Sequence, residues 1–351
     1  MKMNPLFILP FILASLIVAL LSGLVRIGWS LPVSHTAGHH GAIMIGSFLS
    51  SLIMLERAVT FKNKWILLLP LLNAISIIFF LRGDIAIALY LLIAGSAGFA
   101  AMCLYFIYTY KDAYYYLFFI GASCLLIGNV MLLQSNFYPQ AAPWWMGFLL
   151  FTIVAERLEL TRFLQLPRGS HLMLYAALAI VIAGLVIPFH MHGDWIFASG
   201  LVLTACWLLR YDMAFKSMKK AGQHRYSALL LITGYAWLLF AAMFLFAGSE
   251  NPFLYDATLH AFFIGFVFSM IFSHSPIILP AVLRLPVKPY RPFLYVWFVL
   301  LQVSLVLRMV ADAAVMVELR RIAGMINGLV ILFFFISMMV ILKIELAKRK
   351  H

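Results

Sequence analysis

Charged side chains are scarce in this sequence of 351 residues: aspartate and glutamate together number only 12, and all charged residues make up 11%. A soluble globular protein of this length carries roughly 25% charged residues. Cysteine is equally rare, with three residues and no CxxC pair, which argues against a disulfide framework or a cysteine-based zinc site. No CxxCH, P-loop or GxGxxG motif occurs. The sequence therefore excludes covalently attached haem, ATP-driven transport and dinucleotide binding.

Apolar residues make up 65% of the chain, and the mean hydropathy of the sequence is +1.04. They form blocks of about 20 residues, long enough to cross a hydrocarbon core of about 30 Å. The short connections leave no room for a soluble domain. We therefore predict an all-α, polytopic integral membrane protein that forms a single transmembrane domain over residues 1–351. The twelve predicted spans are 5–27, 35–56, 65–82, 84–109, 113–134, 140–164, 171–189, 194–215, 225–248, 254–280, 291–314 and 321–346.

Lysine and arginine indicate how these spans are oriented. With the N-terminus inside, 20 of the 25 cationic residues lie on the inner side, including Lys2, Arg349 and Lys350 at the two ends. The positive-inside rule then predicts an inner (cytoplasmic) membrane protein with both termini in the cytoplasm. The net charge of +13 follows from this topology, so the predicted partner is the lipid bilayer and not a nucleic acid. The cations left outside are Arg26, Arg82, Arg308, Arg320 and Arg321.

Three spans share a short pattern that suggests an internal repeat. Residues 47–57 read SFLSSLIMLER, residues 147–157 read GFLLFTIVAER, and residues 265–275 read GFVFSMIFSHS. They belong to the second, sixth and tenth spans, which predicts three pseudo-repeats of four helices; three helices with merely similar packing are the alternative. Glu56-Arg57 and Glu156-Arg157 end two of the segments. Because a carboxylate near a membrane must be paired or hydrated, these pairs indicate inner-face networks or, alternatively, a proton path.

Histidines gather on the predicted outer side. His39 and His40 begin the second span, and His260 lies one or two turns into the tenth. If the repeats pack around a common centre, these imidazoles lie at similar depth, which is the arrangement that axial ligation of a haem iron needs. An imidazole within an apolar run such as that of His260 requires a ligand or a buried hydrogen bond. We favour His40 over His39, because His40 begins the continuous apolar helix.

A second group of outer residues suggests further ligands. His190 and His192, in FHMHGDW between the seventh and eighth spans, can point two imidazoles at one copper, iron or zinc ion. His35 is a further metal candidate or an ordinary interfacial histidine. Arg26 and Arg308 are candidates for binding haem propionates, because arginine binds carboxylates in a two-pronged geometry. Arg308 also precedes Asp312 by four residues, so a local ion pair is equally expected.

The topology and these histidines resemble the catalytic subunit of haem-copper oxidases, in which twelve helices have three-fold pseudo-symmetry and histidines of the second and tenth helices hold the low-spin haem. The segments HHGAIMIGSFL and LHAFFIGFVFSMIFSH are more similar to NnrS, a haem- and copper-containing membrane family. The resemblance implies a b-type haem, copper as a further metal, an electron donor, and a small diatomic gas such as nitric oxide as substrate or signal.

The sequence also departs from the oxidases. The predicted sixth span contains no histidine or tyrosine where oxidases carry a copper ligand. His260 and His274 are 14 residues apart, about 21 Å along a helix, so they cannot serve one outer centre. These departures argue against oxygen reduction at a paired haem and copper. A histidine-based copper or zinc transporter or delivery protein is the alternative function, with Asn73, Asn129 and Asn327 as its few polar candidates, and a scaffold subunit is a third.

Overall fold

The protein is helical throughout the part of the chain that the structure describes. This computed structural model describes residues 4–162, 164–248, 251 and 253–348, so Lys2, Arg349 and Lys350, counted above among the inner cations, lie outside the described residues. The chain is 85% helix, and no strand occurs among the described residues. Eleven of the described helical segments are long and apolar enough to cross a membrane. The expectation of an all-α, multi-pass membrane protein is confirmed.

The described residues form fifteen α-helices. Six 3₁₀ or π segments precede or separate some of them. The α-helices are α1 (Leu9–Arg26), α2 (His40–Ala42), α3 (Ser50–Ala58), α4 (Leu68–Arg82), α5 (Ile85–Tyr110), α6 (Ala113–Ser135), α7 (Tyr138–Thr161), α8 (Arg168–Val186), α9 (Gly193–Tyr211), α10 (Ala214–Ser217), α11 (Gln223–Phe246), α12 (Phe253–His260), α13 (Ser269–Val282), α14 (Leu294–Ala313) and α15 (Val317–Lys348).

The predicted sixth span, 140–164, forms α7 but is not among the eleven apolar helices. Its 24 residues give a length of about 36 Å, so length does not limit it. Gln140 and Pro143 near one end and Glu156 and Arg157 near the other make it less apolar than its neighbours. Residues 145–155 are all buried. A helix surrounded by protein has no need of an apolar outer surface, because the penalty for polar groups applies where they face lipid.

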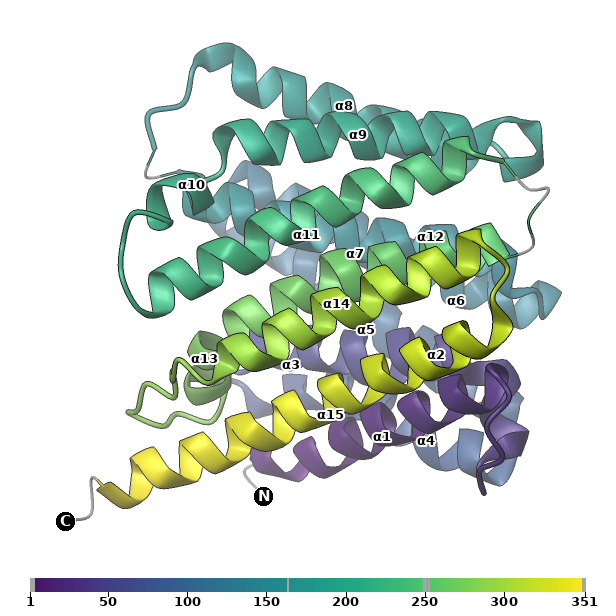
Figure 1. The fold of residues 1–351 in the computed structure, drawn as a ribbon. Helices are drawn as coiled ribbons and strands as arrows, with labels where there is room; N and C mark the ends of the chain where they lie inside the picture. Colours follow the sequence, from purple (N-terminus) through teal and green to yellow (C-terminus); the bar gives the residue numbers. More distant parts are fainter. Residues whose placement is uncertain (1–3, 163, 249–250, 252, 349–351) are drawn as a thin grey trace. The chain divides into compact units, whose positions relative to one another are not determined.

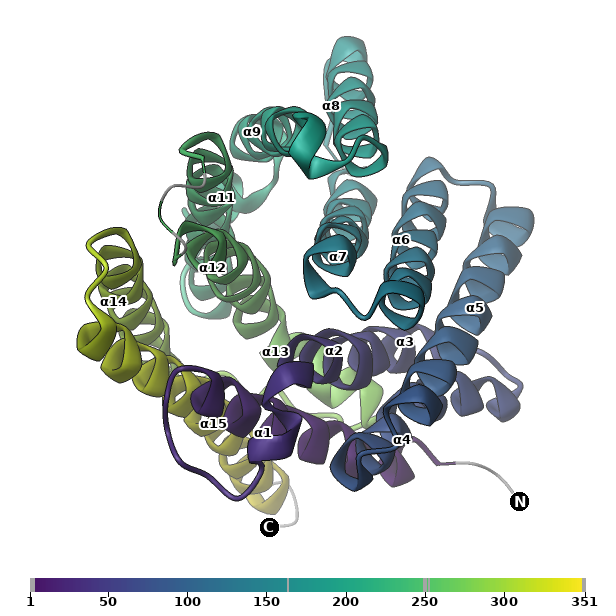
Figure 2. The same cartoon turned by 90° about the vertical axis from the view of Figure 1, so that its right-hand side faces the viewer.

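The chain divides into two compact units, and the first comprises Met1–Ala155 with Ala281–Leu285. In it α4 packs against α5, and α5 packs against α6 (Figure 2). Buried amides join neighbouring helices: the Asn73 amide donates to the Ser50 hydroxyl at 2.6 Å, and the Trp145 indole donates to the Asn129 amide oxygen at 3.0 Å. In both bonds the donor and the acceptor belong to different helices, so these bonds specify which apolar faces meet.

The second unit comprises Glu156–Pro280 and Pro286–His351. In Figure 1, α8 runs along α9, and α14 runs along α15. The segment from α12 onward packs against both α11 and α14. The same kind of polar bond joins helices here: the Trp237 indole donates to Gln302 at 2.6 Å, and the Ser304 hydroxyl bonds to Asn327 at 2.7 Å. That all twelve spans form one membrane domain stays a prediction.

Two helices are interrupted by a π-helical segment at matching positions. The first, η3 (Ile43–Leu49), follows α2, and the second, η6 (Ala261–Phe268), follows α12. In the alignment that pairs Ser47 with Gly265, both segments begin at the same aligned position. Pro143 of α7 occupies that position in the third copy, and proline, which lacks an N–H group, also interrupts the α-helical hydrogen bonding. Single π-helical turns within α-helices occur frequently at functional sites.

Candidate functional site

His260 ends α12 and lies directly before the π-helical segment η6. Its Nδ1 lies 2.8 Å from the backbone carbonyl oxygen of Asp256, one turn earlier, and 3.3 Å from Oδ2 of the same residue. A carbonyl oxygen only accepts hydrogen bonds, so the imidazole carries its proton on Nδ1. In the neutral ring the lone pair is then on Nε2. This is the state in which metal-ligating histidines are held, with one ring nitrogen bonded to the protein and the other directed at the metal.

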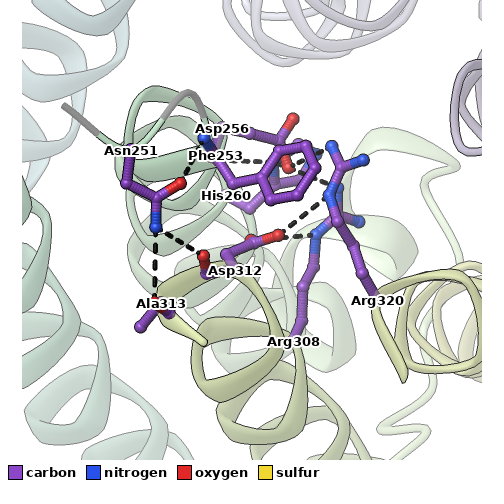
Figure 3. A network of polar contacts seen from close by, with 8 residues as sticks. All are labelled: Asn251, Phe253, Asp256, His260, Arg308, Asp312, Ala313 and Arg320. Carbon is purple, nitrogen blue, oxygen red and sulfur yellow. Dashed lines mark hydrogen bonds and ion pairs between the residues drawn. The ribbon is translucent and has the colours of Figure 1, made fainter. Parts of the chain in front are cut away.

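Asp256 is in turn held by two arginines from other helices. Its Oδ2 lies 2.8 Å from Nη2 of Arg308 on α14 and 3.0 Å from Nη2 of Arg320 on α15. Arg320 also reaches Asp312, with 2.8 Å between Nε and Oδ1. Figure 3 shows the two carboxylates and two guanidinium groups beside the imidazole of His260. We call Asp256, His260, Arg308, Asp312 and Arg320 the outer network; its formal charges cancel when the histidine is neutral.

Asn251 fixes the outer network to the end of α14. Its amide nitrogen donates to the carbonyl oxygens of Asp312 at 2.9 Å and Ala313 at 3.3 Å, and its amide oxygen accepts from the Phe253 N–H at 2.8 Å. The guanidinium of Arg320 stacks over the Phe253 ring, 4.6 Å from its centroid. These contacts satisfy otherwise orphaned backbone groups at the start of α12 and at the end of α14. The helix that carries His260 is therefore held by Asn251 at the end of α14 and by Arg320 of α15.

His40 has the same proton arrangement as His260. Its Nδ1 lies 2.7 Å from the backbone carbonyl oxygen of Ala19 on α1, so Nδ1 donates and the lone pair is on Nε2. The ring rests against Gly23, where a Cβ atom would come within 2.8 Å of Cε1 of His40. His39 differs, because its Nδ1 meets the Tyr138 hydroxyl at 3.0 Å, and a hydroxyl group either donates or accepts. The contacts thus fix the tautomer of His40 and leave that of His39 open.

The other predicted ligands lie on exposed segments. His35 uses Nε2 to donate to the Leu81 carbonyl oxygen at 3.1 Å. His190 and His192 are exposed on either side of Met191, in the turn before α9. Among the described residues, no group of three or more histidine, cysteine or acidic side chains could hold a metal ion. The copper site at these histidines stays a prediction.

The two predicted propionate-binding arginines differ in accessibility. Arg26 is exposed at the end of α1. The Arg308 side chain is only 6% exposed and is engaged with Asp256. Its nearest approach to Asp312, the partner expected from the i,i+4 spacing, is 3.9 Å. Asp256 and Arg320 were not singled out from the sequence, although the four-residue spacing in DATLH signals that Asp256 and His260 lie on one helix face.

A second buried network lies near the predicted inner end of the spans. Arg157 of α7 donates from Nε and Nη2 to the two carboxylate oxygens of Asp212, at 2.8 and 2.9 Å. Its Nη1 lies 3.3 Å from Nε2 of His274 on α13. Arg157 and His274 belong to two copies of the repeat pattern. Arg157 therefore takes part in a buried network with Asp212 as its ionic partner, and the assignment of this end to the inner face stays a prediction.

The Arg157–Asp212 pair allows a test of what stabilises this end of the protein. Asp212→Leu leaves the buried guanidinium of Arg157 without its carboxylate and should lower the free energy of unfolding by about 3–5 kcal/mol. The double variant Arg157→Leu, Asp212→Leu should recover most of that loss. Thermal unfolding of the purified protein in detergent measures both. Glu318→Gln, which removes the exposed partner of Arg321, is the control and should change stability little. A double variant as unstable as Asp212→Leu would contradict the assignment.

Comparisons with known proteins assign the chain to a family. No curated protein and no solved structure matches the chain. A family model described as a domain of unknown function, DUF8744, matches residues 5–343, which is nearly the whole of the sequence. The chain therefore belongs to the DUF8744 family.

Proposed function

We propose that the protein binds a b-type haem near the outer face of the cytoplasmic membrane and acts, like NnrS, in nitric oxide or related nitrogen-oxide chemistry. The observation that carries this proposal is the state of His260. Its Nδ1–H group is bonded to the carbonyl oxygen of Asp256, so Nε2 holds the lone pair that an iron atom requires. His40 is the proposed second ligand, since its Nδ1 is held in the same way by Ala19.

The residues present fit a b-type haem. His40 and His260 would hold the group through two neutral imidazoles, and the absence of CxxCH from the sequence is consistent with a haem held without covalent bonds. Arg26 and Arg308 are the proposed propionate contacts. Arg26 is the more accessible of the two, because Arg308 already pairs with Asp256. His35, His190 and His192 are proposed to bind copper.

When bound, the haem supplies one-electron chemistry or, at an open coordination position, the binding of a diatomic gas such as nitric oxide. His40 and His260 would hold the group and fix its orientation. Two imidazole ligands favour electron transfer, with an external electron donor as partner; copper beside the haem would favour turnover or sensing of the gas. The protein is accordingly proposed as an oxidoreductase or a sensor.

The proposed scaffold has twelve spans in three repeats of four, as in haem-copper oxidases, with both termini in the cytoplasm. Support for the repeat comes from η3 and η6, two π-helical segments that begin at the same aligned position. Pro143 in α7 marks that position in the third copy. Of the two proposed haem ligands, His260 directly precedes η6, and His40 lies three residues before the first residue of η3.

The visible absorption spectrum of purified protein tests the haem. We expect a Soret band that shifts to the red on reduction, its loss in His260→Ala, and its weakening or displacement in His40→Ala. His171→Ala removes an imidazole whose ring contacts Tyr175 on α8, and this control should keep the wild-type spectrum. A colourless wild-type protein with stoichiometric copper or zinc would refute the proposal and favour the transport alternative.

Gly23 provides an independent test of His40. Gly23→Ala places a methyl group 2.8 Å from the imidazole of His40, so the ring must leave its present position, and the spectrum should change as it does in His40→Ala. Gly38→Ala is the matched control, because a Cβ atom there has no neighbour within 4 Å. If Gly23→Ala kept the wild-type spectrum while His40→Ala did not, the proposed position of the ligand would be wrong.

A further inference from the structure

Asp256 contacts the imidazole of His260 through two different groups. The backbone carbonyl oxygen accepts the Nδ1–H bond at 2.8 Å, and the carboxylate Oδ2 lies 3.3 Å from the same nitrogen. Any residue at position 256 supplies the carbonyl oxygen, but only an acidic one adds a negative charge beside the ring. The carbonyl therefore fixes the tautomer, and the carboxylate is left with a separate role.

Negative charge at the N–H side of an imidazole increases electron density on its other nitrogen, and such partners make a histidine a stronger metal ligand. A stronger donor favours the oxidised form of a bound iron. The carboxylate of Asp256 has little freedom to turn away, because Arg308 and Arg320 contact the same oxygen at 2.8 and 3.0 Å. Those arginines come from α14 and α15, so the charge is held in place by two helices outside α12.

We propose that Asp256 is the positioning residue of the haem site: its carboxylate sets the donor strength of His260 and thereby lowers the reduction potential of the iron. This inference rests on the proposed function, since it requires haem ligation by His260. It assigns the outer network a role besides joining α12, α14 and α15.

Redox titration of the purified haem protein, followed by its visible spectrum, tests this role. Asp256→Asn keeps the backbone carbonyl and therefore the tautomer, but removes the charge. We expect it to favour the reduced form about tenfold at a fixed ambient potential, a rise of about 59 mV for a one-electron couple. Asp256→Glu restores a carboxylate and should return the potential toward the wild-type value.

Asp312→Asn is the matched control for Asp256→Asn. Asp312 belongs to the same network and binds Arg320 at 2.8 Å, so its loss removes the same charge and disturbs the same helices. It should shift the potential clearly less than Asp256→Asn, because the carboxylate of Asp256 lies 3.3 Å from the ring nitrogen of His260, whereas that of Asp312 pairs with Arg320. Equal shifts in the two variants, or no shift in Asp256→Asn with haem retained, would overturn the proposal.

Arginine variants keep the inference testable if Asp256→Asn fails to fold. Arg320→Gln removes one of the two cations on the Asp256 carboxylate and should shift the potential in the opposite direction, toward the oxidised form. Arg321→Gln removes a neighbouring cation that pairs with Glu318 and should have little effect. Equal shifts in these two variants would also overturn the proposal. A wild-type protein without haem, or one that retains its haem spectrum in His260→Ala, refutes the proposed function itself.

Discussion

A hydrogen bond from an imidazole Nδ1 to a backbone carbonyl oxygen is the interaction on which the proposed site depends. An imidazole in an apolar helix bundle must bond at least one nitrogen, because an unsatisfied polar group there costs several kcal/mol. For His260 the partner is the carbonyl of Asp256, and for His40 it is the carbonyl of Ala19. In both rings this bond leaves the lone pair on Nε2. The same requirement for a partner thus stabilises the fold and gives both rings the tautomer that the proposed metal ligation requires.

At both ends of the second unit, buried charged side chains are paired with side chains of opposite charge. The outer network brings two carboxylates together with Arg308 and Arg320, and the inner network pairs Arg157 with Asp212. Arginine suits both sites because its planar group can bind two acceptors at once. Each network contains a histidine, but Nε2 of His274 faces Nη1 of Arg157 at 3.3 Å, whereas Nδ1 of His260 lies 3.3 Å from the Asp256 carboxylate. That difference is why we assign it a role in tuning a bound group, and the inner pair a structural one.

Much of the fold could be predicted from the sequence, because hydropathy and the residues that end helices are local features of the chain. The division between α4 and α5, for example, lies at Gly83, whose φ of 83° ends α4 in the left-handed conformation. The partners of Arg157 and Arg320 could not be predicted. Most of these helices are apolar all round, so no amphipathic stripe indicates which faces meet. The Asp256–His260 contact was within reach of the sequence, since a four-residue spacing places both side chains on one helix face.

The proposal that His40 and His260 are both iron ligands has a direct spectroscopic consequence. Two imidazole ligands impose a low-spin state on oxidised haem iron, whereas one imidazole leaves a coordination position open to water or gas. Low-temperature electron paramagnetic resonance of the oxidised protein separates these cases. We predict a low-spin signal in the wild type that becomes high-spin in His40→Ala. A high-spin wild-type signal, or a low-spin signal that persists in both His40→Ala and His260→Ala, would contradict it.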